Sequence, residues 1–117
     1  MYRNTDNWIL HADVYGTADG FDVFVEMPGV QREDIELEVT PLVVKVWGVR
    51  KMPSQGATAL AIEIQTGRFQ REIHLPYRVD TTSVSAELKS GVLYIRLVRQ
   101  KSVKVVVPVQ SEGNKNI

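Results

Sequence analysis

The sequence predicts an all-β fold, an antiparallel β-sandwich, and three observations support this prediction. Short apolar runs of strand length are separated by glycine, proline and polar turn residues along the whole chain. Several of these runs alternate apolar and polar residues, which is the period of a strand with one buried face. Helical spacing nowhere extends over about ten residues without an interrupting glycine or proline. A series of short strands joined by turns is typical of a sandwich.

Four strands are expected in the first half of the chain. The clearest is 34–39, because Ile35, Leu37 and Val39 alternate with three carboxylates, so that one face is apolar and the other is charged. The dipeptide 28–29 (Pro-Gly) ends the strand before it. The expected strands cover 10–15, 21–27, 34–39 and 42–47.

The second half of the chain predicts a long connection followed by a hairpin. Pro53 interrupts 49–58, which is expected to be a loop, and 59–65 can form a short strand within the same connection. The turn 89–91 (Lys-Ser-Gly) joins two β-rich runs, and its glycine can adopt a positive φ. Further strands are expected over 68–75, 83–88, 92–98 and 103–109, and 110–117 is expected to be a disordered tail.

The chain of 117 residues has the length of one domain. We expect a short N-terminal arm at 1–9, one β-domain at 10–99 and a C-terminal extension at 100–117. Without cysteine, disulfides and thiolate metal sites are excluded. No apolar run approaches the roughly 20 residues of a membrane-spanning helix, and the N-terminus lacks a signal-peptide pattern. We therefore expect a soluble, cytoplasmic protein without stable membrane insertion.

The charges are unevenly distributed, although the formal net charge is zero. Residues 1–50 carry nine acidic and four basic side chains, whereas residues 51–117 carry five acidic and ten basic ones. Two interpretations stay open: the halves neutralise each other within one sandwich, or they attract each other between subunits. The basic side chains stand singly, without regularly interleaved aromatic residues, so nucleic-acid binding is not expected.

No sequence pattern indicates catalysis, and we expect a protein that is not an enzyme and uses no cofactor. His11 and His74 cannot form a zinc site without cysteine unless carboxylates converge on them, and no spacing indicates this. The sequence contains neither a G-x-S-x-G nucleophile motif nor a phosphate-binding glycine motif. The carboxylates Asp34, Glu36 and Glu38 are explained by the solvated face of a strand. No catalytic, cofactor-binding or metal-binding residue is predicted.

Residues 86–93 resemble A-x-L-x-x-G-V-L, the signature that closes the α-crystallin domain of the small heat-shock proteins. Five further segments match this family in order and spacing. Among them, 67–76 resemble G-x-F-x-R-x-h-x-L-P, where h is apolar, and 107–109 (Val-Pro-Val) resemble the C-terminal I-x-I/V anchor. The others are 10–15, 21–30 and 34–39. The resemblance covers about residues 10–109, nearly the whole chain.

This resemblance implies an immunoglobulin-like β-sandwich that forms homodimers and can assemble further. It also implies an ATP-independent holdase, a chaperone that binds partly unfolded client proteins and suppresses their aggregation. The alternative is a co-chaperone adaptor similar to a CS domain, which would bind one specific chaperone. Such an adaptor would lack both the closing signature and the Val-Pro-Val segment.

The resemblance further implies an apolar groove between two strand edges, which receives the tail of a neighbouring subunit. The expected groove residues are Leu37, Val39, Val84, Ala86 and Leu88. Val107 and Val109 would enter the groove together because residues i and i+2 of an extended segment share a face, and Pro108 favours the extended form. Three alternatives stay open: all these residues can simply belong to the core, the register can shift to 105–107, or 103–109 can be an ordinary strand of its own sheet.

The long connection is expected to contribute to the dimer. In bacterial and plant members of the family, a strand in this connection exchanges onto the first strand of a partner, whereas in animal members it is fused into the next strand. Pro53, Ser54 and Gly56 separate 59–65 from its neighbours, which favours the exchange over an ordinary surface hairpin. The predicted exchange pairs Ala59, Leu60, Ala61, Ile62 and Ile64 with His11, Ala12, Asp13, Val14 and Tyr15 of a second copy.

Two features depart from the family pattern. Members usually have a longer apolar N-terminal arm that helps to bind clients, whereas about nine residues precede the first expected strand here. In this arm Tyr2, Trp8 and Ile9 are the residues expected to contribute to client binding. His74 stands where arginine is common in relatives, and we expect a hydrogen-bonded strand histidine rather than a pH-dependent switch of assembly.

Overall fold

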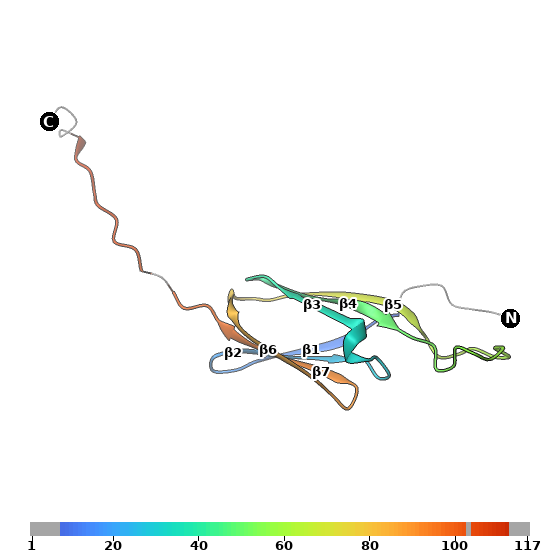
Figure 1. Ribbon diagram of the computed structural model, residues 1–117. Helices are drawn as coiled ribbons and strands as arrows, with labels where there is room; N and C mark the ends of the chain where they lie inside the picture. Colours follow the sequence, from blue (N-terminus) through green and yellow to red (C-terminus); the bar gives the residue numbers. More distant parts are fainter. Residues whose placement is uncertain (1–7, 103, 113–117) are drawn as a thin grey trace.

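The computed structural model describes residues 8–102 and 104–112. They form a sandwich of two antiparallel sheets, one in the order β1-β2-β7-β6 and the other in the order β3-β4-β5 (Figure 1). The strands are β1 His11–Gly16, β2 Gly20–Glu26, β3 Ile35–Val39, β4 Val43–Arg50, β5 Gly67–His74, β6 Val79–Lys89 and β7 Val92–Arg99, and the 3-10 turn η1 covers Arg32–Asp34. The predicted all-β antiparallel sandwich is confirmed.

The core lies between the sheets, and every buried side chain among the described residues is apolar. Alternation along the strands selects these side chains, because every second residue of β2, β4 and β7 points toward the other sheet. Burial of each large apolar side chain stabilises the fold by roughly 1.5–3 kcal/mol. The residues at most 2% exposed are Leu10, Val23, Val25, Met27, Val44, Val46, Phe69, Val79, Ile95 and Leu97.

The segment before β1 determines how the two sheets lie over each other. The Trp8 N–H donates to the carbonyl of Arg68 at 3.0 Å, and the Arg71 guanidinium donates to the carbonyl of Leu10 at 2.7 Å. These contacts hold β5 over the β1 side of the larger sheet. By strand order, β3 and β6 therefore lie at the opposite, shared side of the sandwich.

Trp8 belongs to the core rather than to a free arm. Its indole is 8% exposed and packs edge-to-face on Phe69, with 5.5 Å between ring centroids. The expectation that Trp8 helps to bind clients is therefore wrong, because the side chain is already covered. Ile9 is exposed, and Tyr2 lies outside the described residues.

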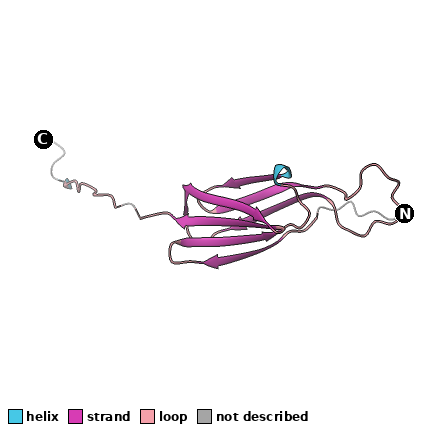
Figure 2. Cartoon of the chain, turned by 60° about the horizontal axis from the view of Figure 1, so that its bottom comes forward, coloured by secondary structure: helices cyan, strands magenta, loops and turns pink. Residues whose placement is uncertain are grey.

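Two predicted strands do not form within this chain. Residues 59–65 lie in the long connection between β4 and β5 without a strand partner, and the described residues of 103–109, from 104 on, belong to neither sheet. Residue 103 lies outside the described residues. Both segments lead away from the sandwich, at its opposite ends (Figure 2). The interpretation of 103–109 as an ordinary strand of its own sheet is thus wrong.

Strand β4 continues beyond position 47, the end of the strand predicted over 42–47. A Cβ atom at Gly48 would overlap the carbonyl oxygen of Asp34 and would lie 2.9 Å from Cζ of Phe69. Glycine is required here for close approach of two backbones, and the residue pairs regularly with Phe69 of β5. The strand ends at Arg50 instead.

An irregularity in β6 brings two valines to the core side of the sheet. Val79 and Val84 are five positions apart, so regular alternation would put them on opposite faces. The pairing register with β7 shifts between them, and both valines face the core. The Asp80 carboxylate stabilises the irregular segment by accepting the Thr82 N–H at 2.9 Å, the Thr82 hydroxyl at 2.6 Å and the Ser83 hydroxyl at 3.2 Å.

Asp80→Ala should therefore destabilise the protein at neutral pH but not in acid. The hydrogen bonds from Thr82 and Ser83 lower the pKa of Asp80 in the folded state. Its contribution to stability is then fully present above the unfolded pKa of about 3.9, and it disappears as the pH falls through the lower folded value. Thermal unfolding of both proteins at pH 7 and in a series below pH 4 measures this. A melting-temperature difference that is independent of pH would contradict it.

Candidate functional site

Strand β1 leaves one edge of the larger sheet open. It pairs only with β2 among the described strands, so the backbone groups on its other side have no strand partner. His11, Asp13, Val14 and Tyr15 are exposed, and Ala12 is half-buried against the core. Such an edge is a template for pairing with a strand of another chain.

The connection between β4 and β5 carries apolar side chains into solvent. Leu60 and Ile64 are 89% and 60% exposed, whereas Ile62 is half-buried. Met52, Pro53, Ala59 and Ile62 are among the residues that line a hollow of about 220 Å³ within this connection. The loop projects beyond the end of the sandwich (Figure 1, green). The two segments predicted to exchange thus have different states in the single chain: His11–Gly16 is an edge strand, and 59–65 is a loop with exposed apolar side chains.

Arg50 ties the base of this connection to the sandwich. Its Nε donates to the carbonyl of Gln65 at 2.8 Å, and its Nη1 donates to the carbonyl of Pro28 at 3.0 Å. The guanidinium also lies over the Trp8 ring, 3.7 Å from its centroid. Partial burial lowers the pKa of Arg50, but an arginine stays charged at physiological pH. Sequence reasoning missed this residue because its three partners, Trp8, Pro28 and Gln65, lie far apart along the chain.

The predicted groove residues lie on the two terminal strands that share the other side of the sandwich. Leu37 and Val39 of β3 pair across the sheet with buried valines of β4, so they face the core. Val84 and Leu88 of β6 pair with buried leucines of β7 and are also half-buried. Ala86 has the same orientation as these two but is exposed. The groove residues predicted from the sequence therefore lie on β3 and β6, the two edge strands at the same side of the sandwich.

The tail does not contact these residues in its own chain. Residues 104–112 run away from the sandwich beyond the end of β7 (Figure 1, orange to red). The side chains of Val107 and Val109 are 70% and 95% exposed, and Val105 and Val106 are 74% and 94% exposed. Pro108 lies between two of them in extended chain. The predicted anchor therefore presents its valines to solvent in the single chain.

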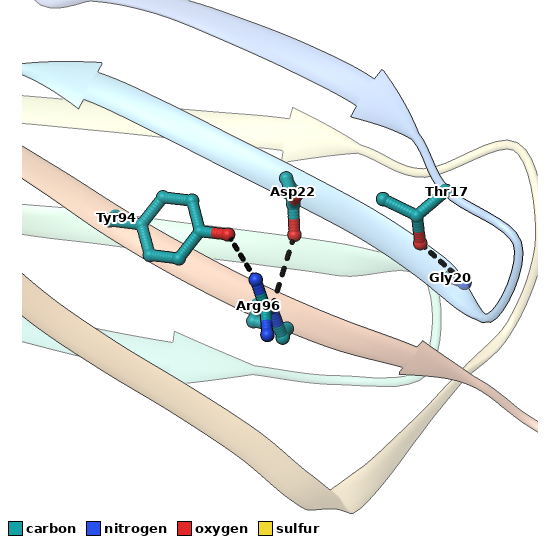
Figure 3. A network of polar contacts seen from close by, with 5 residues as sticks. All are labelled: Thr17, Gly20, Asp22, Tyr94 and Arg96. Atoms are coloured by element: carbon teal, nitrogen blue, oxygen red, sulfur yellow. Dashed lines mark hydrogen bonds and ion pairs between the residues drawn. The ribbon is translucent and has the colours of Figure 1, made fainter.

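The outer face of the larger sheet carries a polar and aromatic network that the sequence analysis did not identify (Figure 3). Arg96 donates to the Tyr94 hydroxyl at 2.7 Å, which raises the pKa of Arg96, and its Nε lies 3.5 Å from the Asp22 carboxylate. Thr17 accepts the Gly20 N–H at 3.0 Å in the turn before β2. Phe24 packs beside Tyr94, with 4.9 Å between the ring centroids. Residues on neighbouring strands make this network, so it follows from the pairing register.

His74 does not form the expected hydrogen bond. Its side chain is exposed on β5, and Nε2 lies 3.9 Å from the carboxylate of Glu72, beyond hydrogen-bonding distance. The described part of the chain contains no group of three His, Cys, Asp or Glu side chains that could hold a metal ion. No helix in that same part is long and apolar enough to cross a membrane.

Most of the chain matches the model of a known protein family. The model of the Hsp20/alpha crystallin family matches residues 13–110. The chain belongs to this family. The assignment confirms the resemblance drawn from the sequence motifs, and it confirms that the protein is not an enzyme, because small heat shock proteins are non-enzymatic chaperones.

Relatives in the Hsp20/alpha crystallin family share roughly a quarter to a third of the aligned residues. The 22.0 kDa heat shock protein of Arabidopsis thaliana is 35% identical over 95 residues, which cover 79% of this chain and 49% of the relative. Small heat shock protein C2 of Rickettsia felis is 26% identical over 100 residues, covering 84% of this chain and 65% of that protein. The chain spans about half the length of the plant relatives that it matches.

Solved structures of the Hsp20/alpha crystallin family have the same fold. HspA of Xanthomonas axonopodis superimposes with a TM-score of 0.70 at 26% identity, covering 81% of this chain and 97% of that one. Heat shock protein 16.0 of Schizosaccharomyces pombe superimposes with a TM-score of 0.72 at 23% identity, covering 89% and 100%. The second match supports the fold alone.

Proposed function

We propose that this chain is an ATP-independent holdase that binds partly unfolded proteins and suppresses their aggregation. The family assignment supports a chaperone role in general. The observation that carries the specific proposal is the set of apolar side chains on unpaired strands and extended segments. Partly unfolded client proteins have in common only exposed apolar segments and unpaired strand edges. The exposed apolar side chains of this chain can bind such segments, and its unpaired strand edges can pair with such strands.

Self-assembly is the second part of the proposal. The open edge of β1 and the segment 59–65 support a homodimer formed by strand exchange, and the valines of the tail support further assembly through the β3 and β6 edges. A single docked tail buries only two or three valines, so it binds weakly and reversibly. Several such contacts acting together hold an assembly. A structure of the Xylella fastidiosa relative is described as a distinct high order structure.

A co-chaperone adaptor is the alternative, and it is less well supported. The segment 86–93 forms the hairpin of β6 and β7, and the Val-Pro-Val segment follows it. Neither is expected in a CS-type adaptor.

We also propose a cytoplasmic location for this protein. One relative, from Solanum lycopersicum, is named as a chloroplastic protein.

The deciding experiment is light scattering from citrate synthase during heating, without ATP, over a titration of this protein. We expect scattering to be suppressed at near-equimolar ratios of subunit to client. A folded sample that leaves the scattering unchanged at a several-fold excess would contradict the holdase and favour the adaptor.

Val107→Ala combined with Val109→Ala should reduce the size of the assembly, because each alanine loses most of the apolar area that its valine can bury. Sedimentation velocity measures the size, and Val106→Ala is the matched control because this valine points to the other side of the extended tail. An unchanged sedimentation coefficient in the double variant would contradict the anchor.

A further inference from the structure

The tail has two different faces. In an extended segment, Val105, Val107 and Val109 share one face, whereas Lys104 lies on the other face together with Val106 and Pro108. Both registers that the sequence left open use the same face, since 105, 107 and 109 have the same parity. The apolar face is therefore a row of three valines, and one cation marks the beginning of the opposite face.

Strand β3 alternates in the same way as the tail, but it carries carboxylates where the tail carries a cation. Ile35, Leu37 and Val39 are half-buried and pack against the core, while Glu36 and Glu38 are exposed on the outer face. The strand is the last of its sheet, and it pairs only with β4 among the described strands. Three inward apolar residues on β3 thus match the three valines of the tail, and two outward carboxylates lie on the side that Lys104 would face.

Neither glutamate of β3 is paired with a cation within the described part of the chain. Among the described residues, neither Glu36 nor Glu38 forms an ion pair, and Lys104 forms none either. Lys45 lies opposite Glu38 on β4, but its ammonium group sits over the Trp47 ring, 5.2 Å from the centroid. This part of the acidic first half of the chain is therefore free to attract a cation of another copy.

We propose that the tail of one copy runs antiparallel along β3 of another copy, with Lys104 paired to Glu38 of the receiving copy. This inference rests on the proposed docking of the tail. With Val107 opposite Leu37, the antiparallel direction puts Lys104 opposite Thr40 and diagonal to Glu38. Diagonal neighbours in a sheet are about 7–8 Å apart, a distance that a lysine side chain spans.

A parallel run of the tail along β3 is disfavoured by the positive charge of Lys51. It would put Lys104 opposite Asp34 of the receiving copy. The Asp34 carboxylate is already paired with Lys51 at 3.2 Å. A second cation at this end would meet the charge of Lys51, which is paired with Asp34, whereas at the Glu38 end the neighbouring cation, Lys45, has its ammonium group over the Trp47 ring. Charge thus sets the direction of a tail whose valine row is symmetric about Val107.

A charge-reversal cycle tests the proposal. Lys104→Glu should weaken assembly of the full chain about fivefold to tenfold at low salt, because an attraction becomes a repulsion. Glu38→Lys alone should do the same, and the double variant should return the association constant to within about twofold of the original. Sedimentation velocity over a dilution series measures the association constants. The loss in Lys104→Glu should shrink at about 0.5 M salt, where charges are screened beyond a few ångströms.

Two controls separate this pairing from the docking itself. Lys101→Glu changes the net charge by the same amount as Lys104→Glu. In an extended tail, Lys101 would lie on the same face as the valines but before the first of them, away from Glu38. This variant should therefore change the association constant less than twofold. If Val107→Ala with Val109→Ala reduces assembly and Lys104→Glu does not, the pairing is wrong while the anchor stands. Restoration of Lys104→Glu by Glu36→Lys rather than by Glu38→Lys would overturn the antiparallel direction. If Val107→Ala combined with Val109→Ala does not reduce the size of the assembly, the proposed docking of the tail fails as a whole.

Discussion

Replacing Leu60 and Ile64 together by serine should dissociate the homodimer into folded monomers. Both side chains are exposed in the single chain, so shortening them removes no core contact. In the proposed exchanged strand they share one face with Ile62, which would extend the core-facing side of β1 beyond Ala12 and Val14. Each buried aliphatic side chain contributes roughly 1.5–3 kcal/mol, and the exchange buries two pairs of them. The dimer should therefore weaken at least about a thousandfold.

Native mass spectrometry at micromolar concentration measures the dimer, and circular dichroism checks that the variant is folded. Ala57→Ser is the matched control, since it changes an exposed residue of the same connection that precedes the exchanged segment. A variant lacking residues 56–65 should also be monomeric. A dimer that persists in both variants would show that the subunits associate elsewhere.

Phe69→Ala should give the largest loss of stability among single changes in the core, about 3–5 kcal/mol. The ring is 1% exposed and packs edge-to-face on Trp8. Its cross-strand partner is Gly48, which has no side chain that could move into the space left by the ring. The cavity therefore stays open, which is the condition under which large-to-small changes cost most.

Urea unfolding of Phe69→Ala is best measured in the monomeric Leu60→Ser, Ile64→Ser background, because dimer dissociation otherwise adds to the free energy of unfolding. Phe24→Ala is the control: this ring is only half-buried, on the outer face of the larger sheet, and its loss should cost less. A cost of under about 1 kcal/mol for Phe69→Ala would mean that the core closes around the missing ring.

The strands with one buried face were predictable from the sequence, and so was much of the candidate site. Alternation in 34–39 placed Leu37 and Val39 on the core side, and the same rule placed Val84 and Leu88 there. These assignments depend on local periodicity, which the chain displays within a few residues. Membership in the family was also predictable, because its motifs are strings of adjacent residues.

Features that depend on distant contacts were not predictable. Trp8 was assigned to a free arm because nothing in the neighbouring residues shows that Phe69 and Arg50 would cover it. The strand predicted over 42–47 stopped before Gly48, whereas the close approach of Asp34 requires this glycine within β4. The segments 59–65 and 104–109 have strand-like sequences, but they pair with no strand edge within the described part of the chain. Their partners are expected on other molecules, and this expectation came from the resemblance to the family and from the residues that flank 59–65, not from strand periodicity.

The contacts of Arg50 have a consequence for the order of folding events. They join Trp8, Pro28 and Gln65 to one side chain, and these residues approach each other only after both sheets have formed and packed. Contacts between distant residues form late, because the chain must first lose the entropy of closing long loops. Gln65 lies beside Arg50 once β4 and β5 pair, whereas the contacts with Pro28 and Trp8, which complete the anchoring of the connection, form after the sheets have packed. Refolding should show a unimolecular phase first, and then a slower phase whose rate rises with protein concentration.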